Sequence, residues 1–207
     1  MNLYADPFIW MDNRWIDYLA PQIYWEFGHS VADFGTLAAF WNSNARNIPV
    51  VIGIAAYKFK DPAYPAYATV SQFERQVDEV RKLTNLQGCF WFRMKYLENN
   101  DIHNFLKAKY KYKSVLPVMG KLTAQNPETP VPAKNGKVIT WNKSTGAEKF
   151  AVYLLEKDKL HINKFIANAV QVSADLQFTG ETGKSYYITA INNDNVESAR
   201  SAVVSIK

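Results

Sequence analysis

Three apolar runs in the first half of the chain predict strands. They are "DYLAPQIYW" at residues 17–25, "IPVVIGIAAYKF" at residues 48–59 and "LQGCFWFRM" at residues 86–94. Each is short, contains β-branched or aromatic residues, and is bounded by polar stretches, which is typical of strands buried in a sheet.

Helical periodicity fills the intervals between these runs. Residues 33–46 and 69–83 place apolar side chains three or four positions apart, with polar side chains between them. Ser71, followed three residues later by Glu74, predicts a capped start for the second helix. Residues 102–108 predict a third helix after the last run. This order predicts βαβ units in a parallel sheet, because parallel neighbours need a crossover of such length.

The pattern changes in the second half, where short alternating runs replace long apolar ones. A proline-rich stretch, with Pro117, Pro127, Pro130 and Pro132, predicts a linker and a domain boundary near residue 126. We therefore expect one domain over residues 1–126 and another over 127–207. The runs that follow predict a β-sandwich: residues 137–141, 149–156, 161–165, 177–180, 185–192 and 199–206.

Composition excludes some classes of protein and leaves others open. The chain has 207 residues, of which 48% are hydrophobic, so it can bury a core. No apolar run approaches the roughly 18 residues of a membrane span, and no signal peptide is predicted. The net charge of +5 is spread along the chain. The "KAKYKYK" cluster at residues 107–113 is interpreted as a solvated helix end, so no nucleic-acid partner is expected.

The second half resembles a fibronectin type III domain. "VITW" at residues 138–141 resembles its second strand, and "YYITAINNDNVESARS" at residues 186–201 resembles its last two strands with their turn. Lys184 stands where that family often has a corner tyrosine. The resemblance implies an all-β sandwich with Trp141 in its core.

The first half resembles the glycosyl hydrolase-like ten family, bacterial envelope proteins with a (β/α)8 barrel. "WIDYLAPQIYW" at 15–25, "IGIAAYKF" at 52–59 and "QGCFWFRMKYL" at 87–97 carry the resemblance. It implies the sixth, seventh and eighth barrel strands, hence a partial TIM-type barrel of the last three βα units. The first five strands have no counterpart, and a three-stranded fragment leaves two unpaired edges.

Barrel strands alternate between lumen and helix layer, and their carboxyl ends carry the site. On the first strand, Gln22, Tyr24 and Glu26 share the inward parity. On the second strand, Tyr57 continues the inward parity, and Tyr57 and Lys58 are expected to reach the mouth. Phe90, Phe92 and Met94 suit the helix layer, which would leave Cys89, Trp91 and Arg93 inward. A sugar site needs aromatic platforms and polar donors. The predicted sugar-binding set is Gln22, Tyr24, Trp25, Tyr57, Lys58, Trp91 and Arg93, although such aromatic residues also fill barrel cores.

Glycoside hydrolysis usually needs two carboxyl groups about 5 to 10 Å apart. Glu26 is the one well-placed candidate, and it is equally compatible with a hydrogen-bonding or surface role. Asp33 is expected to cap the next helix. The three histidines lack metal-ligand spacing, so no metal and no cofactor are expected.

Two functions are compatible with this sequence. In one, the chain is the C-terminal portion of a bacterial glycoside hydrolase acting on polysaccharide or cell-wall glycan, and it is inactive alone. In the other, it is a non-catalytic module that binds glycans or proteins at the cell surface. The expected partners are carbohydrate and either the missing N-terminal barrel half or a second subunit. The family resemblance implies a location in the cell envelope or outside the cell.

Overall fold

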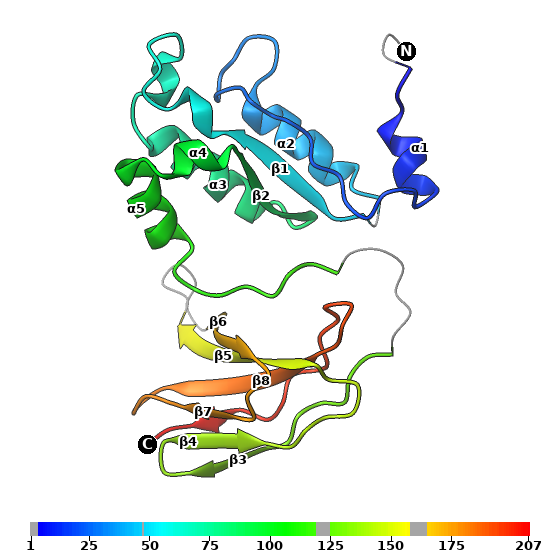
Figure 1. Ribbon diagram of the computed structural model, residues 1–207, viewed down its shortest axis with the longest axis vertical. Helices are drawn as coiled ribbons and strands as arrows, with labels where there is room; N and C mark the ends of the chain where they lie inside the picture. Colours follow the sequence, from blue (N-terminus) through cyan, green and yellow to red (C-terminus); the bar gives the residue numbers. More distant parts are fainter. Residues whose placement is uncertain (1–3, 47, 119–124, 158–164) are drawn as a thin grey trace. The chain divides into compact units, whose positions relative to one another are not determined.

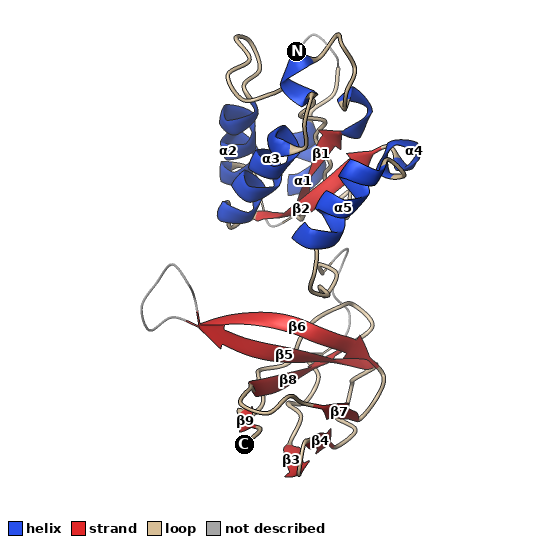
Figure 2. Cartoon of the chain, turned by 90° about the vertical axis from the view of Figure 1, so that its left-hand side faces the viewer, coloured by secondary structure: helices blue, strands red, loops and turns tan. Residues whose placement is uncertain are grey.

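The computed structural model describes residues 4–46, 48–118, 125–157 and 165–207, and their contacts form two compact units. Figures 1 and 2 show the helices in the first unit and the strands β3 to β9 in the second. Described residues through Tyr110 belong to the first unit, whereas Lys111–Val118 already belong with the second. The backbone N–H of Lys113 donates to the carbonyl of Ala169 at 3.1 Å. The change of unit therefore comes earlier than the predicted position near residue 126.

A parallel sheet forms the centre of the first unit. β1 (Val50–Ala55) pairs in parallel with β2 (Leu86–Phe92). Residues 17–25 run alongside β1 and make parallel bridges from Leu19 to Val50 and from Gln22 to Gly53. They form bridges rather than a regular strand, in part because Pro21 lies between the two and has no N–H to donate. The three predicted runs thus lie side by side in parallel.

The helices have the predicted order, with differences at their ends. Asp33 caps α2 (Phe34–Ser43) by accepting the Thr36 N–H at 2.7 Å, as predicted. The predicted cap at Ser71 is wrong, because Ser71 is the first residue of α3 (Ser71–Lys82) and Val70 precedes it without a capping side chain. The other helical segments are α1 (Pro7–Asp12), η1 (Ala56–Lys58), η2 (Pro65–Tyr67), α4 (Met94–Leu97) and α5 (Asn100–Lys109).

One face of the parallel sheet packs against these helices. Ile23 and Ile52 lie in a buried cluster with Phe34 of α2, and Ile54 lies in a second cluster with Phe73 of α3. Cys89 packs at the edge of both clusters, and burial raises the pKa of its thiol to about 12. Cys89 is therefore a packing residue, and its thiol is unreactive.

The second unit is a sandwich of two antiparallel sheets. One sheet has the order β3 (Pro132–Asn135), β4 (Val138–Trp141) and β7 (Gln177–Thr179). The other has the order β6 (Phe165–Ser173), β5 (Lys149–Lys157), β8 (Ser185–Ile191) and β9 (Val204–Ser205). This is the arrangement of a fibronectin type III sandwich, as predicted. Most of the strand predicted at residues 161–165 lies outside the described residues, and β6 begins at its last residue.

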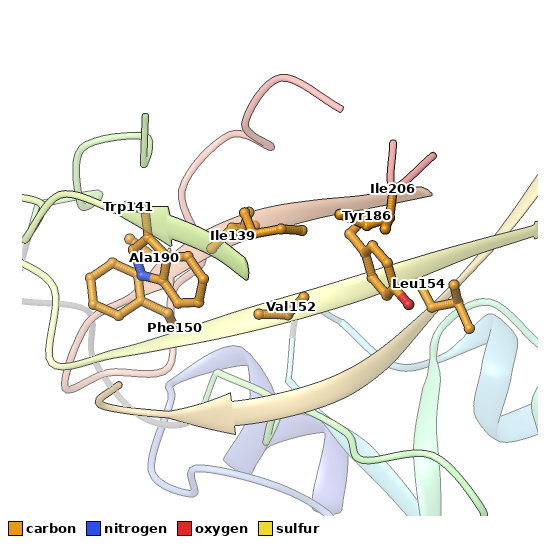
Figure 3. Packing of buried hydrophobic residues seen from close by; sticks show 9 residues of the cluster. Ile139, Trp141, Phe150, Val152, Leu154, Tyr186, Ala190 and Ile206 are labelled. Carbon is orange, nitrogen blue, oxygen red and sulfur yellow. The ribbon is translucent and has the colours of Figure 1, made fainter. Parts of the chain in front are cut away.

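Alternate residues of β4, β5 and β8 form the sandwich core, shown in Figure 3. Trp141 packs against Phe150 with 5.8 Å between ring centroids. The Tyr186 hydroxyl accepts the backbone N–H of Glu181 at 3.0 Å and fixes the corner that leads into β8. This bond identifies Tyr186 as the corner tyrosine of the family. It lies two residues after Lys184, where the corner tyrosine was expected.

The fold prediction therefore holds for a mixed α/β part and a fibronectin type III-like sandwich. Among the residues described, three parallel segments are present in the first unit, and these do not by themselves close a barrel. No helix in the described ranges is both long and apolar enough to cross a membrane.

Replacing Val152 by alanine tests the sandwich core. Val152 is fully buried, so Val152→Ala should lower the free energy of unfolding by about 2 kcal/mol through lost burial and a residual cavity. Val203 of the same unit is 50% exposed, and Val203→Ala should cost less than about 0.5 kcal/mol. Urea unfolding followed by circular dichroism measures both. Equal effects of the two substitutions would contradict this core.

Candidate functional site

The face of the parallel sheet opposite the helices carries aromatic side chains from all three segments. We call Tyr18, Tyr24, Tyr57, Phe90 and Phe92 the aromatic face. Tyr24 stacks on Phe92 with ring centroids 6.1 Å apart and meets Tyr57 edge to face at 5.9 Å. Tyr18 contacts Phe90 at 5.7 Å. Phe90 and Phe92 are 47% and 49% exposed, so these rings form an open surface.

Gly53 makes room for this arrangement in the middle of β1. A Cβ atom at Gly53 would lie 3.1 Å from the Pro21 carbonyl oxygen and 3.3 Å from the Tyr24 ring. The absence of a side chain therefore lets the Tyr24 ring lie against the strand. Tyr57 follows at the carboxyl end of β1, within η1, and contacts Tyr64 and Tyr96 as well.

The structure corrects the predicted orientation of β2. Trp91 lies on the helix side, 5.5 Å from Phe73 and 6.1 Å from Phe105 in ring centroids, whereas Phe92 lies on the aromatic face. Leu86 and Cys89 also pack on the helix side. Leu86 and Cys89 are three residues apart, and in a regular strand they would lie on opposite faces. They share a face because the strand is irregular between them, where the pairing with β1 shifts register between Leu86 and Gly88.

Arg93, which was predicted to point inward with Trp91, follows β2 and is exposed. Its guanidinium lies 5.9 Å from the centroid of the Tyr96 ring, which in turn contacts Tyr57 of the aromatic face. At the end of β2, Phe92 is the residue whose ring contacts Tyr24 and Tyr57. Met94, predicted in the helix layer, is 78% exposed at the start of α4.

Lys58 is buried instead of reaching the mouth of the sheet, where it was predicted. Its side chain is 6% exposed, and its ammonium group donates to the carbonyl of Tyr24 at 2.5 Å. The ammonium also lies 4.4 Å from the centroid of the Tyr64 ring. Burial lowers the pKa of Lys58, and the carboxylate of Glu26 opposes that shift. Lys58 therefore holds the end of the first strand in place.

Two further buried side chains support this strand end. Gln76 of α3 donates from its amide to the carbonyl of Trp25 at 3.0 Å and to the Tyr67 hydroxyl at 3.4 Å. Burial raises the pKa of Tyr67 to about 12, so this phenol stays protonated. Together with Lys58, these groups fix the backbone immediately before Glu26.

The remaining predicted residues lie around this strand end. Gln22 is exposed and shares the strand parity of Tyr24. Glu26 is half-buried, and its main-chain carbonyl accepts the Phe34 N–H at 3.3 Å. The Trp25 ring lies 6.1 Å from His29 in the following loop. Asp33 accepts the N–H groups of Gly28 and Thr36, which lowers the pKa of its carboxyl group.

Sequence reasoning missed Phe92, Phe90 and Tyr18 as members of the surface, and Lys58 as a supporting residue. Gly88 was the available signal, because an isolated glycine inside a strand pattern often marks a bulge that reverses the alternation. No corresponding signal in the sequence pattern pointed to the carbonyl contacts of Lys58 and Gln76. Across the ranges that the structure describes, no cluster of three metal-ligating side chains is found.

Comparison with known proteins finds one matching family model and several similar proteins. The model of the family Glycosyl hydrolase-like 10 matches residues 1–68. Glycosyl hydrolase YngK of Bacillus subtilis (strain 168) is 28% identical over 97% of this chain and 43% of its own length. Glycosyl hydrolase DigH of Escherichia coli K12 is 33% identical over 45% of this chain and 23% of its own length. The chain thus spans less than half the length of these curated relatives.

Solved fibronectin type III structures align with part of the chain. The domain of human fibronectin type III domain containing protein 3 is 20% identical and covers 41% of this chain and 88% of its own, with a TM-score of 0.30. An Fn3-like protein from Clostridium thermocellum is 24% identical and covers 39% and 90%, with a TM-score of 0.25. From its family match, its sheet order and its corner tyrosine, the chain combines a part like the Glycosyl hydrolase-like 10 family with a fibronectin type III-like domain.

Proposed function

We propose that this chain supplies the last three βα units of a glycoside hydrolase-like (β/α)8 barrel, and that its aromatic face forms one wall of the sugar-binding cleft. The single observation that carries the proposal is the open aromatic face opposite the helix layer. In a barrel that face points into the lumen, and the strand ends bearing Tyr24, Tyr57 and Phe92 point toward the active-site mouth. The family match and the glycosyl hydrolase relatives support this placement.

The chemistry of the aromatic face suits a carbohydrate. Flat rings such as Phe92 pack against the apolar face of a sugar ring, while phenol hydroxyls exchange hydrogen bonds with its hydroxyl groups. Burial raises the pKa of both Tyr24 and Tyr57, with a further contribution from a neighbouring phenol in each case. Both groups therefore stay neutral near pH 7 and are able to donate. Gln22 adds a side-chain amide on the same side of the strand as Tyr24.

The sheet edges favour a partner that completes the barrel. Among the described residues, no additional strand pairs with the outer edge of residues 17–25 or with that of β2. Parallel sheets are normally covered on both faces, so an open face and two open edges call for further strands. We propose that these strands come from the upstream part of a longer protein or from a second subunit.

Among the described carboxyl groups that follow the first strand and β1, Asp33 and Asp61 already accept backbone hydrogen bonds, so neither is free to act with Glu26. Glu26 is the proposed catalytic group, and the hydrogen bonds from Lys58 and Gln76 fix the backbone immediately before it. Asp33 is occupied by the start of α2, and Asp61 accepts the Ala63 N–H at 2.9 Å within its own turn. A glycosidase needs a second carboxyl group within about 10 Å. We therefore assign the second group to the missing strands.

The occupation of Asp33 and Asp61 by backbone hydrogen bonds also favours another candidate function. In that case the chain is a non-catalytic module whose aromatic face binds glycans. Both functions place the protein where polysaccharide or cell-wall glycan is found, in the cell envelope or outside the cell. A test of turnover and a test of binding separate them.

The chain alone should not hydrolyse glycosides. Incubation with aryl glycosides and with cell-wall glycan should release no product above buffer, and Glu26→Gln should change nothing, because the second carboxyl group is missing. Product release that disappears in Glu26→Gln would contradict this assignment and place the complete catalytic pair in the chain itself.

The chain should nevertheless bind oligosaccharides through the aromatic face. Titration with neutral oligosaccharides should change the tryptophan fluorescence saturably, because exposed Trp25 directly follows Tyr24 at the strand end. Phe92→Ala should weaken binding about tenfold by removing a stacking platform.

Phe40→Ala is the matched control for this binding test. Phe40 is 46% exposed, similar to Phe92, but it lies on α2 and packs against Trp41. Its substitution should leave the affinity within twofold of the original. Equal losses in Phe92→Ala and Phe40→Ala, or no saturable response with any saccharide, would contradict the proposed site.

A further inference from the structure

A groove lies within the second unit, between residues 112–118 and the four-stranded sheet. Its volume is about 480 Å³, which falls in the size range of small-molecule sites. One wall is the extended segment Tyr112–Val118, and the other comes from β5, β6 and the loop after β8. The polar side chains that line it are Tyr112, Lys113, Ser114, Tyr153, Asn168, Asn195 and Glu197.

Tyr153 and Glu197 form a fixed pair on the sheet side of the groove. The Tyr153 hydroxyl donates to a carboxylate oxygen of Glu197 at 2.5 Å, and the Thr189 hydroxyl donates to the same oxygen at 3.3 Å. The Tyr153 ring stacks on Tyr187 with centroids 4.8 Å apart and planes 16° apart. Burial, followed by the contact with Glu197, raises the pKa of Tyr153, so its proton stays in the hydrogen bond.

Tyr112 and Asn168 are fixed in a similar way. The Tyr112 hydroxyl and the Asn168 side-chain amide donate to one carboxylate oxygen of Glu156, at 2.7 Å and 2.9 Å. Both contacts hold side chains of the groove wall in one orientation. Nearby, the Asn195 side-chain carbonyl accepts from Lys149 at 2.9 Å, which orients the NH2 group of that amide.

We propose that this groove binds a short neutral saccharide, a mono- or disaccharide unit, independently of the aromatic face. Its walls combine phenol rings with hydroxyl, amide and carboxylate groups that are already oriented, which is the set that sugar hydroxyls and ring faces require. The carboxylate of Glu197 and the ammonium of Lys113 have opposite charges, so the groove favours a ligand without net charge. An added peptide strand fits less well, because Lys113 already pairs with Ala169 on β6.

The test is to titrate the full 207-residue chain separately with cellobiose, maltose and chitobiose. Backbone amide NMR spectra recorded during each titration monitor binding. Amide signals of residues 112–116, 118, 167–169 and 195–197 should shift saturably with at least one of these sugars. Because the signals are assigned to positions, binding at the groove is distinguished from binding at the aromatic face. Failure of one site therefore leaves the other open to its own test.

Tyr153→Phe should weaken groove binding at least fivefold, because it removes the hydroxyl that orients Glu197 while keeping the ring. Tyr187→Phe is the matched control: Tyr187 stacks on Tyr153 but does not line the groove, so its affinity should stay within twofold. Glu197→Gln provides a second variant that retains the side-chain shape, and it should also weaken binding. Unchanged signals outside the groove show that each variant is folded.

Three outcomes would overturn the proposal. In the first, the groove amides do not shift with any of the three sugars. In the second, Tyr153→Phe and Tyr187→Phe bind the sugar with the same affinity. In the third, an unrelated extended peptide shifts these amides while the sugars do not, which would assign the groove to a peptide.

Discussion

Helices cover one face of the parallel sheet, and the first unit is organised around this asymmetry. Apolar side chains of residues 17–25, β1 and β2 reach the clusters that contain Phe34 and Phe73. The hydrophobic effect of this burial holds the three segments together, and it leaves their other sides outward. Because side chains alternate along a strand, that outward side collects Tyr24 and Phe92 into one surface. The aromatic face is therefore a consequence of how the helices pack.

The end of the first strand depends on a second interaction, the burial of polar groups that hold its carbonyls. Lys58, Tyr67 and Gln76 come from three segments after β1, namely η1, η2 and α3, and they reach the peptide groups of Tyr24 and Trp25. Buried polar groups are costly unless they are hydrogen-bonded, so these contacts specify one position for this strand end. Glu26 follows directly, so the network fixes the backbone immediately before it. The network connects the fold of the unit to the proposed chemistry.

Much of the fold could be predicted from the sequence because hydrophobic periodicity reports burial directly. The parallel order of the three runs, the Asp33 cap and the sandwich all follow from such patterns. The orientation of β2 could not be predicted from size and polarity, since both Trp91 and Phe92 are large and apolar. An irregularity near Gly88 decided which of them faces the helices. The corner tyrosine was expected at position 184, but a hydrogen bond to Glu181 identifies it as Tyr186.

Sugar binding by the aromatic face can be observed by NMR of the aromatic side chains, with the chain saturated with a neutral oligosaccharide. Sugar bound at this face should give intermolecular contacts from sugar protons to the rings of Tyr24, Tyr57 and Phe92, and none to the Trp91 ring on the helix side. Contacts confined to other parts of the first unit, or no contacts to these three rings, would contradict sugar binding by this face.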